Sequence, residues 1–305
     1  MNAPSGPNPG ELITQMTSVA QAPSVATPDV VGPRPTIDIT PPVGWWAIPF
    51  REVWDYRELL YFFVWRDVKV RYKQTAIGVA WVVLQPLMTS AIFVLFFGRL
   101  AKLSPQGVPS LVFYFAGLVP WMYFAYSLNH ATNTVVDNQN LLTKVYFPRL
   151  ILPITAVLSG LVDFAIGFLM MLGVTLGYRI RPGASILWLP ALLLLAVCTA
   201  FGVGLWTSAL NALYRDVRAV MPFLVQFWMF ASPVAYPSTM VPARWRWLYG
   251  LNPMAGVIDG FRWALTGHGQ PPGVPLLVSA VMVAIVLITG LMFFYRMEGT
   301  VADLV

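Results

Sequence analysis

Long apolar segments alternate with short polar segments along most of this chain. Six of the apolar segments reach or approach the roughly 20 residues that cross a hydrocarbon core of about 30 Å. They are 77–98, 111–129, 150–176, 186–210, 217–233 and 275–295. The pattern predicts an all-α membrane protein with six transmembrane helices, of which the fifth is the shortest. Pro86 predicts a kink in the first of them.

Three other segments do not fit this alternation. Residues 1–42 are rich in Pro, Ser, Thr and Ala and lack apolar periodicity, which predicts a disordered tail. Residues 43–75 mix aromatic and basic side chains, which predicts an amphipathic helix in the plane of the membrane surface, with Asp67 and Arg71 spaced for an i, i+4 ion pair. Residues 251–265 are apolar but too short to cross. We therefore expect two short re-entrant helices, separated at Asn252–Pro253, that enter from the outer face.

The composition supports a membrane protein and suggests its orientation. The chain is 57% hydrophobic and 10% charged, whereas soluble domains have about 25% charged residues. Its net charge of +6 is typical of contact with anionic lipid rather than with nucleic acid. If residues 1–76 lie inside the cell, twelve of the 19 Lys and Arg residues are cytoplasmic. This excess predicts that both termini are cytoplasmic.

A polar, Asn-rich and basic segment, Asp137–Arg149, separates the second predicted span from the third. The predicted orientation places it in the cytoplasm, where a soluble partner can bind it. The sequence contains no G-x-x-x-x-G-K-[ST] loop, so ATP hydrolysis would need another subunit. It also contains no Cys or His spacing typical of a metal site, and we predict no bound metal.

Asp163 is the one acidic residue deep within a predicted span. Carboxylates at this depth are costly and often functional, but a proton relay would need a second acid or histidine at mid-span. We expect Asp163 to bond to a neighbouring helix or to face an aqueous lumen. Aromatic residues make up 14% of the chain, which favours core packing and interface belts. The alternative is a channel lining that contacts sugar rings.

Seven motifs, spread in order over residues 50–305, carry a family resemblance. They are Arg71–Pro86 (RYKQTAIGVAWVVLQP), Leu118–Phe124 (LVPWMYF), Lys144–Arg149 (KVYFPR), Asn211–Val217 (NALYRDV), Ser232–Pro237 (SPVAYP), Leu251–Met254 (LNPM) and Phe294–Asp303 (FYRMEGTVAD). Together they resemble the polysaccharide-exporting permeases of ABC transporters, the type-2 exporter family that includes O-antigen and teichoic-acid permeases. In the last motif, Val301 stands where the family has an aromatic residue.

The resemblance implies a fold, partners and a substrate. Residues 76–305 would form a six-span permease domain of the cell inner membrane, with two re-entrant gate helices on the periplasmic side. Two copies of the chain would form a homodimer with a channel between them. Two copies of a separate cytoplasmic ATPase subunit would bind ATP and Mg²⁺, so this chain needs no cofactor. The substrate would be an undecaprenyl-pyrophosphate-linked glycan, such as the O-antigen of lipopolysaccharide.

The resemblance also implies roles for four groups of residues. A coupling helix at 133–144 and the segment after it would contact the ATPase through Asn133, Asp137, Asn138, Asn140, Lys144 and Arg149. Four residues would meet the lipid pyrophosphate at the membrane surface, namely Arg66, Lys69, Arg71 and Lys73. The channel aromatics would be Trp81, Trp121, Tyr123, Phe124, Tyr126, Phe227 and Trp228. The periplasmic gate would contain Tyr236, Asn252, Asp259 and Arg262.

Three alternatives remain open from the sequence. A related fold could export small amphiphiles or drugs instead of a polymer. A membrane glycosyltransferase would need clustered acidic residues, whereas Asp137, Asp216 and Asp259 are scattered. An ion-coupled carrier would need paired intramembrane acids, and Asp163 has no such companion in the sequence.

Overall fold

Helices account for most of the described chain, which comprises residues 50–73, 78–103, 107–268 and 273–304 of a computed structural model. No strand occurs in these four ranges, and the predicted all-α class is confirmed for them. They belong to one compact unit, Trp45–Val305. The predicted tail at 1–42 and the first seven residues of the predicted surface helix, 43–49, lie outside the described residues.

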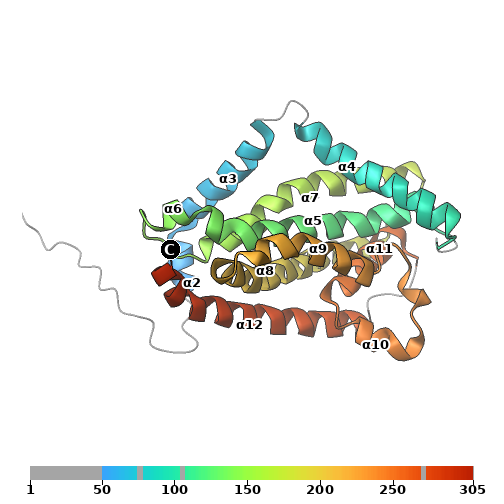
Figure 1. The fold of residues 1–305 in the computed structure, drawn as a ribbon. Coiled ribbons are helices and arrows are strands. Elements are labelled where there is room, and N and C mark those ends of the chain that lie inside the picture. The colour runs from blue at the N-terminus through green and yellow to red at the C-terminus, as the bar shows by residue number, and fades with distance from the viewer. Residues whose placement is uncertain (1–49, 74–77, 104–106, 269–272, 305) are drawn as a thin grey trace, which may run out of the picture. The chain divides into compact units, whose positions relative to one another are not determined.

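Figure 1 shows the order and arrangement of the helices. They are α2 (Phe50–Asp55), α3 (Arg57–Lys73), α4 (Gly78–Phe93), the π-helix η1 (Val94–Leu100), α5 (Ser110–Asp137), α6 (Gln139–Leu142), α7 (Ile151–Gly177), the 3₁₀ helix η2 (Ala184–Trp188), α8 (Leu189–Leu213), α9 (Asp216–Ala231), the 3₁₀ helices η3 (Ser238–Met240) and η4 (Ala243–Trp245), α10 (Arg246–Tyr249), α11 (Pro253–Thr266) and α12 (Val274–Leu304).

Five helical segments of the described chain are long and apolar enough to cross a membrane. They are Ala80–Leu100, Ser110–Asp137, Ile151–Gly177, Ala184–Leu213 and Val274–Met297. The predicted span at 217–233 forms α9, which has 16 residues. At 1.5 Å per residue, α9 is about 24 Å long, shorter than a hydrocarbon core of about 30 Å. The five long segments confirm a multi-pass membrane protein. That α9 also crosses the membrane stays a prediction.

α5 is the central helix of the bundle. It packs along α7 on one flank and along α8 on another, and α12 packs along α8. The short helix α11 contacts α5, α8 and α12. Its apolar residues are fully buried, namely Val257, Ile258, Phe261, Ala264 and Leu265. Most of the apolar segment 251–265 is thus enclosed by protein, while Leu251 at its start is exposed and Trp263 is partly buried.

The local sequence explains where α11 begins and ends. Asn252 is its N-cap, and the side chain of this residue accepts a hydrogen bond from the backbone N–H of Met254 at 3.1 Å. Pro253 occupies the first helical position, where a missing N–H costs nothing. Gly267 follows the last turn with φ of +66°, the left-handed conformation that ends many helices. The predicted break at Asn252–Pro253 is therefore confirmed.

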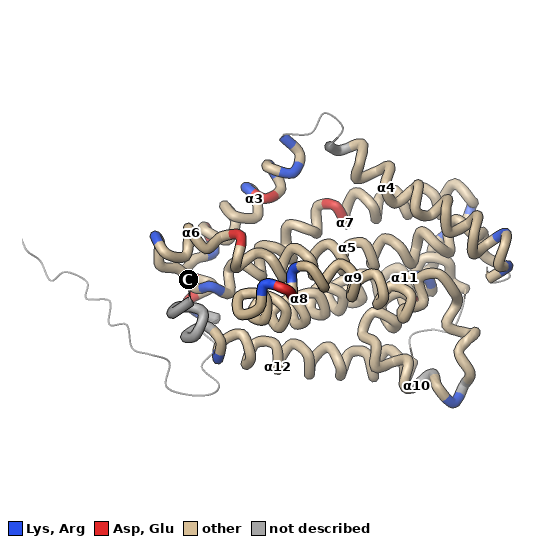
Figure 2. The backbone as a smooth tube through the Cα atoms, in the orientation of Figure 1, with Lys and Arg blue, Asp and Glu red and all other residues tan. Residues whose placement is uncertain are grey.

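Charged residues gather toward the ends of the long helices, and most of α5, α8 and α12 is uncharged (Figure 2). This distribution suits helices whose middle parts lie in hydrocarbon. α3 and α4 lie over the same side of the bundle, where α3 contacts α7 and α4 contacts both α5 and α7. Asp163 is a charged residue in the middle of α7.

Candidate functional site

The polar end of α5 leads into the segment between α5 and α7. α5 runs without interruption to Asp137, and Asn138 then leaves the helical conformation with φ of −107° and ψ of 20°. Its side-chain Nδ2 donates to the carbonyl of Thr134 at 2.8 Å, which caps the end of α5. The single coupling helix implied at 133–144 is therefore divided, because this cap stops α5 and a four-residue helix, α6, follows.

We name residues 138–149 the docking segment. Asn140, Lys144, Val145 and Tyr146 are exposed in it. Phe147 then turns inward and packs its ring edge-on against Phe63 of α3, with centroids 5.6 Å apart. The segment thus presents a polar surface that is anchored by a buried aromatic residue.

The other predicted coupling residues are already engaged within the chain or lie deeper. The Asp137 carboxylate pairs with Arg218 at 3.0 Å, and Asn138 accepts from Arg66 at 3.3 Å. Asn133 lies one turn inside α5, where its Oδ1 accepts from Asn211 at 3.4 Å. Arg149 is partly buried. The outward-facing part of the predicted set is therefore centred on Asn140 and Lys144.

α3 is attached to the bundle near this segment by a polar cluster. The guanidinium of Arg66 donates to Asp67 at 2.9 Å, and the other oxygen of Asp67 contacts Nε2 of His130 on α5 at 3.2 Å. Burial acts to raise the pKa of Asp67, but hydrogen bonds from His130 and Arg66 outweigh it and leave this pKa below its ordinary 3.8. The cluster therefore holds an ionised carboxylate between α3 and α5.

The second attachment of α3 is at Asp163. Both Arg71 and the hydroxyl of Tyr72 donate to the Asp163 carboxylate. Burial, and then the hydrogen bond to Asp163, raise the pKa of Tyr72, so its hydroxyl stays protonated and donates. The sequence favours an Asp67–Arg71 pair, but the structure pairs each of them with a different residue. The predicted bond from Asp163 to a neighbouring helix is present.

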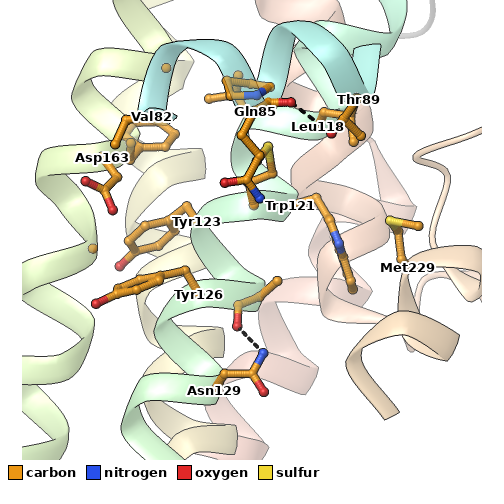
Figure 3. A pocket seen from close by; sticks show the side chains of 17 residues that line it. Val82, Gln85, Thr89, Leu118, Trp121, Tyr123, Tyr126, Asn129, Asp163 and Met229 are labelled. Atoms are coloured by element: carbon orange, nitrogen blue, oxygen red, sulfur yellow. Dashed lines mark hydrogen bonds between the residues drawn. The ribbon is translucent and has the colours of Figure 1, made fainter. Parts of the chain in front are cut away.

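A cavity of about 450 Å³ lies beside Asp163, between α4 on one side and α5 and α7 on the other. Figure 3 shows Asp163 and Tyr123 on one wall and Trp121 and Met229 on the opposite wall. Gln85 enters the cavity from α4. Aromatic faces combined with amide and carboxylate groups can contact both the apolar and the hydroxyl parts of a polar ligand.

The predicted channel aromatics divide into three sets. Phe124 is completely buried, with its ring against Trp121 at 5.3 Å and Trp228 at 5.0 Å between centroids, as core packing requires. Trp81 and Phe227 are exposed on α4 and α9. Trp121, Tyr123 and Tyr126 line the cavity.

The four predicted gate residues belong to one connected region, formed around Arg262 of α11. Its side chain is 7% exposed. Nη2 donates to the carbonyl of Val234 at 2.8 Å and Nε to that of Phe113 at 3.2 Å, while Nη1 lies 3.6 Å from Asp259. Its guanidinium carbon also lies 3.7 Å from the ring centroid of Phe113. A cation buried at this depth is stable because these partners surround it.

Gly117 on α5 makes room for Arg262. A Cβ at position 117 would lie 2.7 Å from Nη2 of Arg262, closer than real Cβ contacts. Tyr236 accepts a bond from the Tyr249 hydroxyl at 2.9 Å, and its carbonyl lies 3.5 Å from Arg262. Asn252 accepts from Trp228 at 2.9 Å and donates to Ser232 at 2.9 Å. Both ends of α11 are therefore bonded to α9 or to the turn after it.

Sequence reasoning missed several of these residues. His130 was not selected, although it contacts Asp67. Gln85 and Thr89 were not selected, although two polar residues one turn apart within an apolar span are a signal of a polar surface. Tyr72 carried no such signal, because its role depends on the position of α7.

A comparison with known families identifies the chain. The model of the ABC-2 type transporter family matches residues 58–266. The chain belongs to the ABC-2 type transporter family. Family membership confirms the prediction of a transporter permease rather than an enzyme. The matched range runs from α3 to the end of α11, so in this chain it contains both attachments of α3, the cavity and the Arg262 region.

Individual relatives cover most of the same range. The chain is 31% identical over 240 residues to the O-antigen export system permease protein RfbA of Myxococcus xanthus, across 78% of this chain and 91% of that protein. It is 28% identical over 207 residues to RfbA of Klebsiella pneumoniae, across 67% and 79%. It is 25% identical over 239 residues to the polysialic acid transport protein KpsM of Escherichia coli, across 76% and 91%.

Proposed function

We propose that this chain is the permease subunit of an ATP-driven exporter of a lipid-linked polysaccharide. The observation that carries the proposal is its similarity to RfbA over 91% of that protein. RfbA and KpsM are named for the export of O-antigen and the transport of polysialic acid, and both of these are polysaccharides. The cavity, with aromatic and polar walls, has the chemistry that sugar rings require.

The proposed orientation places the chain in the inner membrane, with both termini and the docking segment in the cytoplasm. α9 is the fifth of six crossing helices and α11 a re-entrant gate element on the periplasmic side. The excess of Lys and Arg on the cytoplasmic side supports this orientation. The burial of α11 supports a helix that stays within the membrane region without lipid contact.

The proposed channel lies between two copies of the chain. Phe223, Phe227 and Phe230 recur at helical spacing on α9, and all three are exposed in a single copy. A second copy covers this face in the homodimer, together with the exposed side of α4 that includes Trp81. In this arrangement the lipid pyrophosphate meets Lys69 and Lys73, which are exposed on α3, because Arg66 and Arg71 already bind carboxylates.

Two copies of an ATPase subunit dock on the docking segment. Lys144 and Asn140 supply its exposed polar surface, and Tyr146 supplies an exposed aromatic group of the kind enriched in protein interfaces. Because Phe147 packs on Phe63, a displacement of the docking segment is transmitted directly to α3. ATP and Mg²⁺ stay on the ATPase.

Charge reversal tests the docking. We expect Lys144→Glu combined with Arg149→Glu to abolish copurification of the ATPase and to stop export, while the permease still reaches the membrane. The matched control is Arg181→Glu, which changes an exposed charge beyond the opposite end of α7 from the docking segment. It should leave both copurification and export unchanged. Normal copurification and full export by the double variant would contradict docking at this segment.

The substrate is tested in cells that make the polysaccharide. Deletion of the gene should leave lipid-linked glycan inside the cell and none on the surface, and the intact gene should restore surface glycan. Normal surface glycan after deletion, accompanied by loss of resistance to amphiphilic drugs, would instead support the alternative of a small-molecule exporter.

A further inference from the structure

α3 is bonded to the rest of the protein at two points along its length. Toward its middle, Arg66 donates to Asn138 of the docking segment at 3.3 Å, and Asp67 contacts His130 at 3.2 Å. At its C-terminal end, Arg71 and Tyr72 donate to Asp163. The first attachment lies at the docking segment and the second at the wall of the cavity.

The second attachment is unusual in its depth along α7. Asp163 is the thirteenth residue of a 27-residue spanning helix, and a carboxylate near the centre of a span is costly unless it is paired. Arg71 supplies the opposite charge, and its guanidinium carbon also lies 4.1 Å from the ring centroid of Tyr126 on α5. The pair is about one quarter exposed, so the two charges interact in a medium less polar than water.

The end of α3 limits where α4 can start. Four residues separate Lys73 from Gly78, and five Cα steps extend to about 19 Å at most. α4 supplies Val82, Gln85, Pro86 and Thr89 to the cavity, so it forms one wall. Only 17% of its span is buried, against 78% of α5. In a single copy α4 therefore has little packing of its own, and its position depends in part on the attachment of α3 that precedes it.

We propose that the Arg71–Asp163 pair is a latch that holds α4 over the cavity, and that α3 transmits movement of the docking segment to this latch. Arg71 and Asp163 are then positioning residues for transport. When the pair separates, α4 moves away from α5 and α7 and the cavity opens. The second part, transmission from the docking segment, rests on the proposed function; the first part does not.

Distances between spin labels test the latch without any transport. The single cysteine is replaced (Cys198→Ala), and label pairs are placed at exposed positions on α4 and α7 (Met88 and Leu169) or, as a control, on α8 and α12 (Leu194 and Val281). The protein is measured by double electron–electron resonance in lipid nanodiscs. When Arg71 and Asp163 are unchanged, the labels on α4 and α7 should give one narrow distance.

Asp163→Asn removes the charge at nearly constant shape and should add a longer α4–α7 distance population, while the α8–α12 distance stays the same. Tyr72→Phe removes one hydrogen bond and should have a smaller effect. The exchanged pair Arg71→Asp with Asp163→Arg should restore the narrow distance, which a role limited to side-chain shape would not do. An unchanged α4–α7 distance in Asp163→Asn overturns the latch. Broadening of both the α4–α7 and the α8–α12 distance distributions also overturns the latch, because the ion pair would then stabilise the whole fold.

Addition of the ATPase with a non-hydrolysable ATP analogue tests transmission. The α4–α7 distance should lengthen in the unsubstituted protein and should not change in Arg66→Ala with Asn138→Ala. A change in both proteins overturns transmission through α3. If the ATPase fails to bind, the proposed docking fails, while the distances measured without it still decide the latch.

Discussion

α4, continued by η1, and α5 are consecutive apolar segments of membrane-spanning length, yet the protein holds them in opposite ways. In the most apolar stretch of α5, 78% of residues are buried, whereas the corresponding share of α4 is 17%. α5 contacts α7, α8, α9 and α11, and α4 has its contacts with α3, α5, α7 and η1. Phe124 of α5 is completely enclosed, while Met88 of α4 is half exposed.

The difference teaches that apolar length alone does not define a helix's role. α5 is fixed by side-chain packing, which is strong at short range and permits few alternative positions. α4 follows α3, which is attached through ion pairs and hydrogen bonds that can separate and re-form. We infer that α5 forms the static part of the permease and that α3 and α4 form the part that moves.

The largest expected effect is at Arg262, which bonds α11 to α5. Arg262→Ala leaves Asp259 without its cation and removes the side-chain donor to the carbonyls of Phe113 and Val234. A buried polar group left without its partner costs about 1–3 kcal/mol, and we expect the variant to lose its monodisperse peak in detergent. Arg244→Ala, at an exposed arginine, should behave like the original protein. Equal stability of the two variants would contradict a structural role for the buried cation.

A pair of truncations compares α5 and α4 directly. Phe124→Ala should lower the free energy of unfolding by about 3 kcal/mol, because it removes a fully buried ring. Met88→Ala should change it by less than about 0.5 kcal/mol, as exposed substitutions usually do. Thermal unfolding followed by size-exclusion chromatography measures both. Similar losses would mean that α4 is packed as tightly as α5.

A smaller effect is expected where α12 meets α8. A Cβ at Gly290 would lie 2.5 Å from the carbonyl oxygen of Gly202, so Gly290→Ala should destabilise the protein by about 1–3 kcal/mol through overpacking. Gly173→Ala in α7 is the matched control, since a Cβ there meets nothing within 4 Å. The same thermal assay compares them. A neutral Gly290→Ala would show that this contact can separate like those of α4.

The smallest effect concerns the attachment of α3 and depends on pH. Because the pKa of Asp67 is lower in the folded protein than its ordinary 3.8, its ionised form stabilises the fold above this value. That contribution is lost as the pH falls through the folded-state pKa. Asp67→Asn should therefore weaken the protein at neutral pH and reduce the further loss in acid. Identical melting curves of both proteins from pH 7 down to pH values below 3.8 would contradict the Asp67 attachment.

Much of this fold was predictable because membranes impose long apolar runs. The spans at 111–129 and 150–176 correspond to α5 and α7, and the Asn252–Pro253 break corresponds to the cap of α11. Local rules of length and capping are sufficient for these features. The continuation of α5 to Asp137 was not predicted, since polar residues can extend a helix into water as well as end it.

The contacts between helices were much less predictable. The sequence indicated that Asp163 needs a partner, but Arg71 and Tyr72 lie more than 90 positions away in the chain. For the same reason Arg66, Lys69, Arg71 and Lys73 looked equivalent on one helix. Only the position of α7 and α5 around α3 separates Arg66 and Arg71, which bind carboxylates, from the exposed Lys69 and Lys73.

Transport in a defined system tests the central claim most directly. The permease and its partner ATPase are reconstituted in liposomes that contain a pyrophosphate-linked glycan in the outer leaflet, and glycan that becomes enclosed is measured by its protection from an added glycosidase. With the ATPase facing outward, the account predicts protection that requires ATP and is lost in Lys144→Glu with Arg149→Glu. ATP hydrolysis by the intact complex without protected glycan would contradict it.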